Sequence, residues 1–376
     1  MSRAHGRFDA VLYAPWAGPL VGGSSFGGAT GGGETQAVLL ASLLAERGLR
    51  VGLIVVGAEG ELAASVGKVR IVRQEPRRRS GGLLGRASLA AGAMRAMAGV
   101  RTDVLIQMNA GPTTGIAALV ARLRGAHLVY MSMNVVDFEF ARHEPSRANV
   151  QLYEWGVRHA SEVVVQDSHQ ARLCRARFGR DPVVIHSIAT PAEPRTGQPE
   201  AFLWVGRLQS WKNPGAYLDL ARAVPEARFW MIAVPQDTEP PEMRRRLDDA
   251  LGELPNLELL DARPREELGK LMERAVAIVS TSESEGMPNV FLEAWSRGVP
   301  ALALSFDPDG MIARNGLGAW AAGDPDRFVA QARRLWDHRE DQAQLSERCV
   351  AYVRSAHGEK RLTDRWLETI ERVRRT

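Results

Sequence analysis

Cysteine is scarce in this chain of 376 residues, and what the sequence lacks excludes several classes of protein. Its two cysteines, Cys174 and Cys349, have no spacing typical of metal ligands or of a disulfide framework, so neither is expected. No apolar run reaches the roughly 20 residues that a membrane-spanning helix needs. The N-terminus lacks the apolar core and the cleavage site of a signal peptide, so we expect a cytoplasmic protein.

Two common glycine motifs for nucleotides are also absent. Residues 22–33 are rich in glycine, but Gln36 stands where Gly-x-Gly-x-x-Gly requires its third glycine, and no Gly-Lys-Ser/Thr is present. A glycine-rich loop between a strand and a helix that runs to Arg47 can still bring backbone N–H groups close to a phosphate or a sugar. An ordinary surface loop is the alternative.

What is present indicates a large globular α/β protein. Hydrophobic residues make up 45% of the chain and charged residues 24%, and the length suffices for two domains. Runs typical of strands alternate with helical patterns, as in parallel sheets. The expected strands are residues 9–14, 50–56, 69–73, 102–107, 127–132, 162–166, 182–186, 201–205, 228–233, 257–260, 275–280 and 300–304.

The pattern starts again after residues 189–194, which have the composition of a linker. We therefore expect an N-terminal Rossmann-like domain over residues 1–188 and a C-terminal one over residues 195–358. A last helix at about residues 359–374 could cross back onto the first domain.

Two carboxylates in the second half are the most informative feature. Residues 275–280 predict a buried strand, and Pro288 suits the first turn of a helix over about residues 288–297. Glu285 then falls on the loop before this helix and Glu293 within it. The N–H groups at the start of a helix are a good seat for phosphate, and Glu293 could accept hydrogen bonds from ribose hydroxyls. A surface helix with two solvated acids is the alternative.

Two cations follow an earlier strand-like run closely. Arg207 offers a planar fork for two phosphate oxygens, Lys212 adds a compact charge, and Gly206 lets the backbone approach a ligand. Together the cations could neutralise a leaving diphosphate. An ordinary pair of solvated cations is the alternative.

With these two groups of residues together, the chain resembles the family-4 retaining glycosyltransferases. The segment from Glu285 to Glu293 is similar to that family's Glu-x7-Glu motif, and Gly-Arg-Leu followed by Lys-Asn-Pro, from Gly206 to Pro214, is similar to a second signature. The resemblance implies the GT-B fold, in which two Rossmann-like domains face each other across a central cleft. It also implies transfer of a sugar, with retention, from a nucleotide-diphosphate sugar to an acceptor hydroxyl.

The resemblance further implies roles for single residues. Arg207 and Lys212 would bind the donor diphosphate, Glu293 the ribose, and Glu285 the hydroxyls of the donor sugar. The other donor-binding positions that it implies are Gly32, Gly33, Asn134, Gly206, Gly286, Met287, Pro288, Asn289 and Val290. A non-catalytic relative that binds nucleotide sugars, or an epimerase of the same fold, is the alternative.

One segment departs from the family pattern. Many relatives carry a histidine of the catalytic region where residues 129–137 of this chain have none. Asn134 and Asp137 are the candidates for its place, although Asp137 could equally cap the following helix. His143 is more typical of a surface position.

Metal is not expected despite two Asp-x-Asp triplets, at residues 307–309 and 324–326. Arg207, Lys212 and the helix N-terminus already supply positive charge, and Asp324 before Pro325 is typical of a helix N-cap. We therefore expect activity that survives chelation and no cofactor besides the nucleotide-sugar co-substrate.

The acceptor is not specified, and a sugar, a lipid-linked glycan or a small molecule would each fit an enzyme of glycan, polysaccharide or glycolipid biosynthesis. A basic cluster that includes Arg77, Arg78 and Arg79 could touch anionic lipids at the inner membrane face. An exposed loop is the alternative, since the formal net charge is only +4. Nucleic acid is not expected, because the cluster lacks interleaved aromatic residues. The cluster comprises Lys68, Arg70, Arg73, Arg77, Arg78, Arg79 and Arg86.

Overall fold

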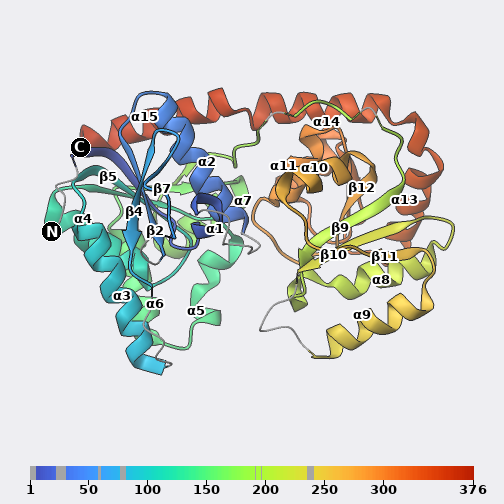
Figure 1. Ribbon diagram of the computed structural model, residues 1–376, viewed down its shortest axis with the longest axis horizontal. Helices are drawn as coiled ribbons and strands as arrows, with labels where there is room; N and C mark the ends of the chain where they lie inside the picture. The colour runs from blue at the N-terminus through green and yellow to red at the C-terminus, as the bar shows by residue number, and fades with distance from the viewer. Residues whose placement is uncertain are drawn as a thin grey trace. The chain divides into compact units, whose positions relative to one another are not determined.

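The structure is a computed structural model that describes residues 6–22, 31–57, 61–76, 82–190, 192–195, 197–234 and 241–376, without the side chains of residues 82–87 and 265. Contacts divide the chain into two compact units (Figure 1). The N-terminal unit comprises Met1–Ile188 and Glu359–Thr376, and the C-terminal unit comprises Ala189–Gly358. Among the helices of the described ranges, none is both long and apolar enough to span a membrane.

The N-terminal unit is built on an eight-stranded sheet with the order β3-β4-β2-β1-β5-β6-β7-β8. Neighbouring strands are parallel, except that β3 and β4 are antiparallel. The strands are β1 (Phe8–Tyr13), β2 (Val51–Val56), β3 (Ser65–Val66), β4 (Val69–Gln74), β5 (Thr102–Met108), β6 (His127–Met131), β7 (Glu162–Val165) and β8 (Val183–Val184). Its described helices are α1 (Gly18–Val21), α2 (Gly32–Glu46), α3 (Gly82–Ala98), α4 (Pro112–Arg124), η1 (Val135–Glu139), α5 (Phe140–His143), α6 (Arg147–Arg158), α7 (Ser168–Phe178) and α15 (Glu359–Arg374).

Helices cover both faces of this sheet because its strands are apolar on both sides. Successive residues of β1 point to opposite faces, so that Leu12 packs into one core cluster and Val11 into the other. The first cluster includes α2 and α15, through residues such as Leu40 and Trp366, and the second includes α3, α4, α6 and α7. The last helix of the chain is thus part of the core of the N-terminal unit (Figure 1).

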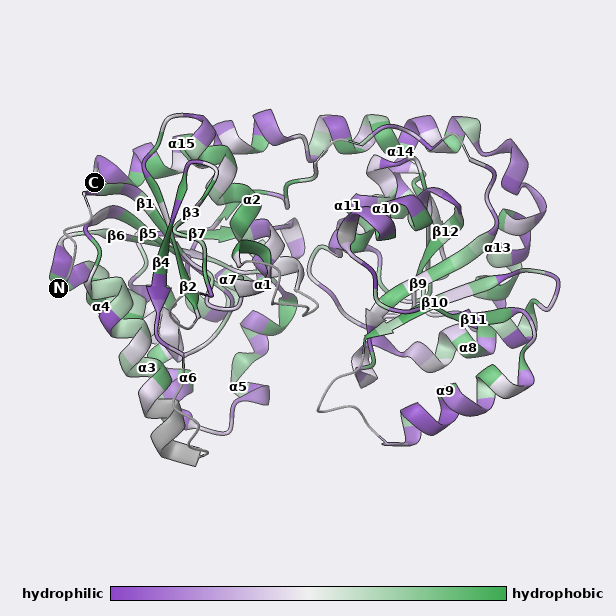
Figure 2. Ribbon diagram, viewed as in Figure 1, coloured by the Kyte–Doolittle hydropathy of each residue, from purple (hydrophilic) through white to green (hydrophobic). Residues whose placement is uncertain are grey.

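The C-terminal unit has a six-stranded parallel sheet with the order β11-β10-β9-β12-β13-β14. Its strands are β9 (Ala201–Arg207), β10 (Phe229–Val234), β11 (Leu257–Leu259), β12 (Ala275–Ser280), β13 (Ala301–Ala303) and β14 (Gly318–Trp320). Its described helices are η2 (Ser210–Lys212), α8 (Pro214–Ala223), α9 (Pro241–Glu253), α10 (Arg265–Glu273), α11 (Asn289–Ser296), η3 (Pro308–Gly310), α12 (Met311–Asn315), α13 (Pro325–Asp337), η4 (Arg339–Asp341) and α14 (Ala343–Ala356). Figure 2 shows hydrophobic residues along β9 and β12 and hydrophilic residues along α9.

Each sheet has one point at which the chain changes direction across it. In the N-terminal unit the chain moves outward from β1 through β2 to β4 and then returns to the other side of β1 with β5. In the C-terminal unit the same change lies between β9 and β12. In open parallel sheets, ligands bind beside the carboxyl ends of the strands at such a switch point. The fold therefore indicates one candidate site in each unit.

The twelve strands predicted from sequence are all found, although β8 has only two residues. Two further strands, the two-residue β3 and the three-residue β14, were not predicted. Pro288 was expected in the first turn of its helix but lies one residue earlier, at the N-cap of α11. Its φ of −64° suits either position.

Candidate functional site

The switch point of the C-terminal unit brings together two of the predicted residues. Lys212 follows β9 and Glu285 follows β12, and the Lys212 ammonium forms an ion pair with Oε1 of Glu285. The side chain of Lys212 is 23% exposed and that of Glu285 only 9%, so the pair is largely shielded from water. The same Oε1 accepts a hydrogen bond from Ser282 Oγ at 2.9 Å. Oε2 of Glu285 accepts none from the residues that the structure describes, and it is available to a ligand hydroxyl.

The loops that carry this pair are connected by further hydrogen bonds. Thr281 Oγ1 donates to the Lys212 carbonyl at 2.8 Å and accepts from Trp204 Nε1 at 3.1 Å. The Glu283 N–H donates to the Trp211 carbonyl at 3.0 Å. These bonds fix the position of Lys212 relative to the end of β12. Sequence reasoning missed Ser282 and Thr281, because hydroxyl residues on a polar turn carry no distinctive pattern.

The ammonium of Lys212 also lies 4.6 Å from the centroid of the Trp211 ring, a cation–π contact. An ammonium has three N–H donors, and Glu285 takes one of them. Lys212 is therefore oriented but retains donors for an anionic ligand. Because Glu285 already compensates its charge, the net positive charge for such a ligand must come from elsewhere.

Arg207 is the nearest source of that charge along the chain. It is the last residue of β9, is partly buried, and its side chain has no hydrogen bond or ion pair to any residue that the structure describes. Gly206 before it is explained by packing, because a Cβ at this position would lie 2.8 Å from the Trp204 ring. The structure thus gives Gly206 a reason that the sequence did not show.

The helix that follows Glu285 presents Glu293 on its partly exposed face. Asn289 and Glu293 are four residues apart and both are half-buried, so they share one side of α11. The opposite side packs into the core, through Phe291 and Trp295 among others. Four more predicted positions lie at the start of this helix: Gly286 and Pro288 are buried, Met287 has its side chain in the core, and Val290 packs against that core.

Asn134 and Asp137 lie in the N-terminal unit and form a capping box at the start of η1. Asn134 Oδ1 accepts the Val136 N–H at 3.1 Å, and Asp137 Oδ2 accepts the N–H groups of Met133 at 2.8 Å and Asn134 at 3.3 Å. Of the two interpretations left open for Asp137, this geometry matches the cap. The carboxylate is buried, which raises the pKa of Asp137, although the hydrogen bonds that it accepts act in the opposite direction.

Asp137 also connects two loops. Its Oδ1 accepts the Ala110 N–H at 3.3 Å, and its Oδ2 accepts Ser132 Oγ at 3.0 Å. The loop after β5 is thereby held against the loop after β6. His143, at the end of α5, is exposed.

Gly32 and Gly33 form the first turn of α2, after Gly31 at its N-cap. Gly33 lines a cavity of about 100 Å³ at the carboxyl ends of β1 and β5. The rest of the predicted glycine-rich loop, residues 23–30, lies outside the described residues. So do Arg77, Arg78 and Arg79 of the basic cluster, whereas Lys68, Arg70 and Arg73 are exposed.

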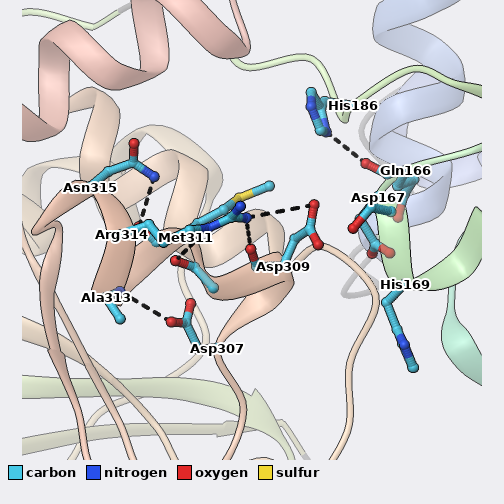
Figure 3. Close-up of polar contacts among 12 residues, drawn as sticks. Gln166, Asp167, His169, His186, Asp307, Asp309, Met311, Ala313, Arg314 and Asn315 are labelled. Carbon is cyan, nitrogen blue, oxygen red and sulfur yellow. Dashed lines mark hydrogen bonds and ion pairs between the residues drawn. The ribbon is translucent and has the colours of Figure 1, made fainter.

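The first aspartate of each Asp-x-Asp triplet accepts hydrogen bonds from backbone N–H groups. Asp324 caps α13 and accepts the N–H groups of Asp326 and Arg327, as predicted. Asp307 accepts those of Ile312 at 2.8 Å and Ala313 at 3.1 Å (Figure 3). Burial raises the pKa of Asp307. In the described parts of the chain no cluster of three or more His, Cys, Asp or Glu residues could hold a metal ion.

Solved structures with this fold are glycosyltransferases of the GT-B class. The chain is similar to sucrose-phosphate synthase from Thermosynechococcus elongatus, with a TM-score of 0.77 and 14% identity over 97% of this chain and 98% of that one. It is also similar to HepE from Anabaena, solved with UDP and glucose, with a TM-score of 0.72 and 15% identity over 98% of this chain and 100% of that one. At these identities the likeness establishes the fold.

The family follows from the sequence of both units. Residues 199–338 match the family model of glycosyl transferases group 1, and residues 31–191 match that of a glycosyl transferase 4-like domain. The chain therefore belongs to the group 1 glycosyl transferases. It is also 27% identical, over 117 residues, to a glycosyltransferase 1 domain-containing protein from Xenopus tropicalis. That match spans 31% of this chain and only 34% of the relative.

Proposed function

We propose that this protein transfers a sugar from a nucleotide-diphosphate donor to an acceptor hydroxyl, with retention at the anomeric carbon and without a metal ion. The observation that carries the proposal is the Lys212–Glu285 pair at the switch point between β9 and β12. Arg207 lies at the end of β9. The binding of UDP and glucose by HepE, a protein of the same fold, supports a nucleotide-sugar donor.

Each residue has a role in this mechanism that its geometry supports. Arg207 and Lys212 would neutralise the diphosphate as negative charge builds up on the leaving group. The Oε2 atom of Glu285 would accept a hydroxyl of the donor sugar, and Glu293 would accept the ribose hydroxyls. The backbone from Gly286 to Asn289 would line the phosphate and the sugar at the start of α11. Arg207, the remaining N–H donors of Lys212 and the N–H groups at the start of α11 would stabilise the diphosphate in place of a divalent ion.

The first test is a thermal-shift screen against UDP-, GDP- and ADP-sugars, with and without a chelator. A ligand that binds only the folded state raises its unfolding temperature, so one donor should stabilise the protein, and chelation should not remove the effect. Glu293→Ala should weaken this stabilisation. Glu283→Ala is the matched control, because Glu283 is an exposed acid two residues before Glu285. Stabilisation that disappears with the chelator would show that the donor site needs a metal.

Retention is tested on the slow transfer of the donor sugar to water. At high enzyme concentration this transfer is made faster than mutarotation of the released sugar. Proton NMR then distinguishes the anomer released first from the one formed later by mutarotation. We expect the anomer of the donor, and first release of the opposite anomer would exclude a retaining mechanism. An epimerase would convert the donor without an acceptor, and a non-catalytic relative would bind it without turnover.

The biosynthetic context is part of the same proposal. We propose a role in glycan, polysaccharide or glycolipid synthesis, with a sugar or a lipid-linked glycan as acceptor. Contact with anionic lipid through Arg77, Arg78 and Arg79 would place such an enzyme at the inner membrane face. Binding to vesicles that contain anionic lipid, lost when these three residues are replaced by alanine, is the measurement that decides it.

A further inference from the structure

Trp211 lies directly before Lys212 in η2, and its ring makes the cation–π contact with the Lys212 ammonium. Its side chain is half-buried, but it belongs to no core cluster of the described residues. The ring contacts no other aromatic ring, and its indole N–H has no hydrogen bond, among the residues that the structure describes. The hydrophobic core therefore does not account for a large aromatic side chain at this position.

The main chain of Trp211 is fixed to the loop that carries Glu285. The Trp211 carbonyl accepts the Glu283 N–H at 3.0 Å, and the next carbonyl, that of Lys212, accepts Thr281 Oγ1 at 2.8 Å. The indole ring and the carboxylate thus stand on connected backbone segments. The flexible part of the arrangement is the side chain of Lys212, whose four-carbon stem has many rotamers.

The ring and the carboxylate act on the ammonium in different ways. Glu285 attracts the ammonium but also compensates its charge, which weakens the attraction for an anionic ligand. An indole ring carries no net charge and attracts a cation through the negative face of its π system. The ring therefore orients the ammonium and leaves its charge available. Because the Lys212 side chain is only 23% exposed, this attraction is stronger than at an open surface.

The proposed reaction requires the ammonium to change its main partner. Negative charge builds up on the leaving diphosphate in the transition state, and the ammonium then has to turn part of its N–H donors away from Glu285. A lysine held by the carboxylate alone would lose its orientation as that pair weakens. The Trp211 ring supplies a second contact, 4.6 Å from Nζ to the ring centroid, that does not depend on the pair.

We propose that Trp211 is a positioning residue, whose ring holds the Lys212 ammonium while it turns from Glu285 toward the leaving diphosphate. The proposal rests on the proposed glycosyl transfer, since it concerns the cation that stabilises the leaving group of that reaction. Trp211 acts through Lys212 and supplies no charge of its own.

The test is the rate at which the whole protein releases nucleoside diphosphate from the UDP-, GDP- or ADP-sugar that stabilises it, with water as the acceptor. Trp211→Leu keeps an apolar side chain but removes the aromatic face. It should lower kcat by about three- to thirtyfold with little change in the KM for the donor. Trp211→Phe should restore most of the rate, and because phenylalanine has no indole N–H, this rescue would exclude a hydrogen bond from that group as the cause.

Fluorinated tryptophans at position 211 separate the cation–π contact from a structural role. Fluorine withdraws electrons from the ring, so it weakens the attraction for a cation with little change in ring size. The logarithm of kcat should fall steadily with each added fluorine, while the unfolding temperature changes little. A purely structural role would give the same kcat throughout this series.

Trp336 provides the matched control. Its ring centroid lies 4.3 Å from the Arg339 guanidinium, and its ring lies near that of Phe202 at the start of β9, whereas Arg207 ends this strand. The same fluorinated tryptophans at Trp336 should leave kcat unchanged.

A kcat that is independent of fluorination at position 211, or a Trp211→Leu variant as active as the wild type, would overturn the proposal. In that case Arg207→Ala still lowers kcat, and the proposed donor site stands. Failure of the proposed function has a different signature, since the wild type then releases no nucleoside diphosphate from any of the three kinds of donor. The role of Trp211 would fall with it.

Discussion

The ammonium of Lys212 pairs with the carboxylate of Glu285, although the two residues are 73 positions apart in the chain. The pair is largely buried and lies where β9 and β12 are neighbours. Removing one partner of a shielded pair leaves the other charge uncompensated, which for fully buried pairs costs about 3–5 kcal/mol. Function and stability are therefore coupled at Lys212, and Arg207, which has no partner among the described residues, gives the cleaner test of charge.

Arg207→Ala should lower the rate of sugar transfer by about ten- to a thousandfold, because it removes positive charge from the leaving diphosphate. Its unfolding temperature should stay close to that of the wild type. Lys212→Ala should lower both the rate and the stability. Arg228→Ala, an exposed cation just before β10 at the opposite edge of the sheet, is the control and should change neither. Full activity of Arg207→Ala would refute the proposed donor site.

Gly206→Ala should destabilise the C-terminal unit by about 1–3 kcal/mol, because the new methyl group overlaps the Trp204 ring. Trp204 donates a hydrogen bond to Thr281, which in turn donates one to the Lys212 carbonyl. Displacement of Trp204 should therefore also weaken donor binding. Urea denaturation and the nucleotide thermal shift measure the two effects. Gly252→Ala, in α9 with open space around it, should not be destabilising.

Asp137→Ala should destabilise the protein by about 2–4 kcal/mol, since it leaves several backbone N–H groups without an acceptor. Asp137→Asn should cost less, about 1 kcal/mol, because its amide oxygen can replace Oδ2 while its NH₂ group opposes the Ala110 N–H. Chemical denaturation of both variants gives the order. Equal losses would contradict the separate role of the Ala110 contact.

The difference in stability between the wild type and Asp137→Asn should depend on pH with a definite sign. Burial raises the pKa of Asp137, so the folded state holds a proton more strongly than the unfolded state. The stability contributed by Asp137 is then greatest at acid pH and declines as the pH rises through its folded pKa. The wild type should accordingly gain stability relative to Asp137→Asn as the pH falls from about 7 towards 4. A difference in stability that is constant with pH would show that the pKa of the Asp137 carboxylate is the same in the folded and unfolded states.

Neither thiol should react in the native protein. Cys174 and Cys349 are buried, and burial raises the pKa of Cys174 to about 11 and that of Cys349 to about 12. Only the thiolate is nucleophilic, so both groups are neutral and unreactive at pH 8. Ellman's reagent should detect no free thiol before unfolding and both thiols in guanidinium. Rapid reaction of the native protein would show that α7, which carries Cys174, or α14, which carries Cys349, opens readily.

Much of the architecture could be predicted because it is encoded locally. Apolar runs such as Ala275–Ser280 identify strands that are buried on both faces, and Asp324 before Pro325 identifies a helix start. Motifs read along the chain were also sufficient to indicate the family. Short strands such as β3 and β14 could not be predicted, since they form only where a neighbouring strand offers its edge.

The sequence by itself determined that this protein is a two-part α/β chain with the motifs of a glycosyltransferase. Only the tertiary structure decided which residues meet. Lys212 reaches Glu285 because β12 returns beside β9, and Trp16 shares a cavity with Asn109 because β5 returns beside β1. The physical reason is that strand order depends on how helices and strands pack across the whole sheet. Parallel strands then bring their carboxyl ends, and the loops that follow them, to one common edge.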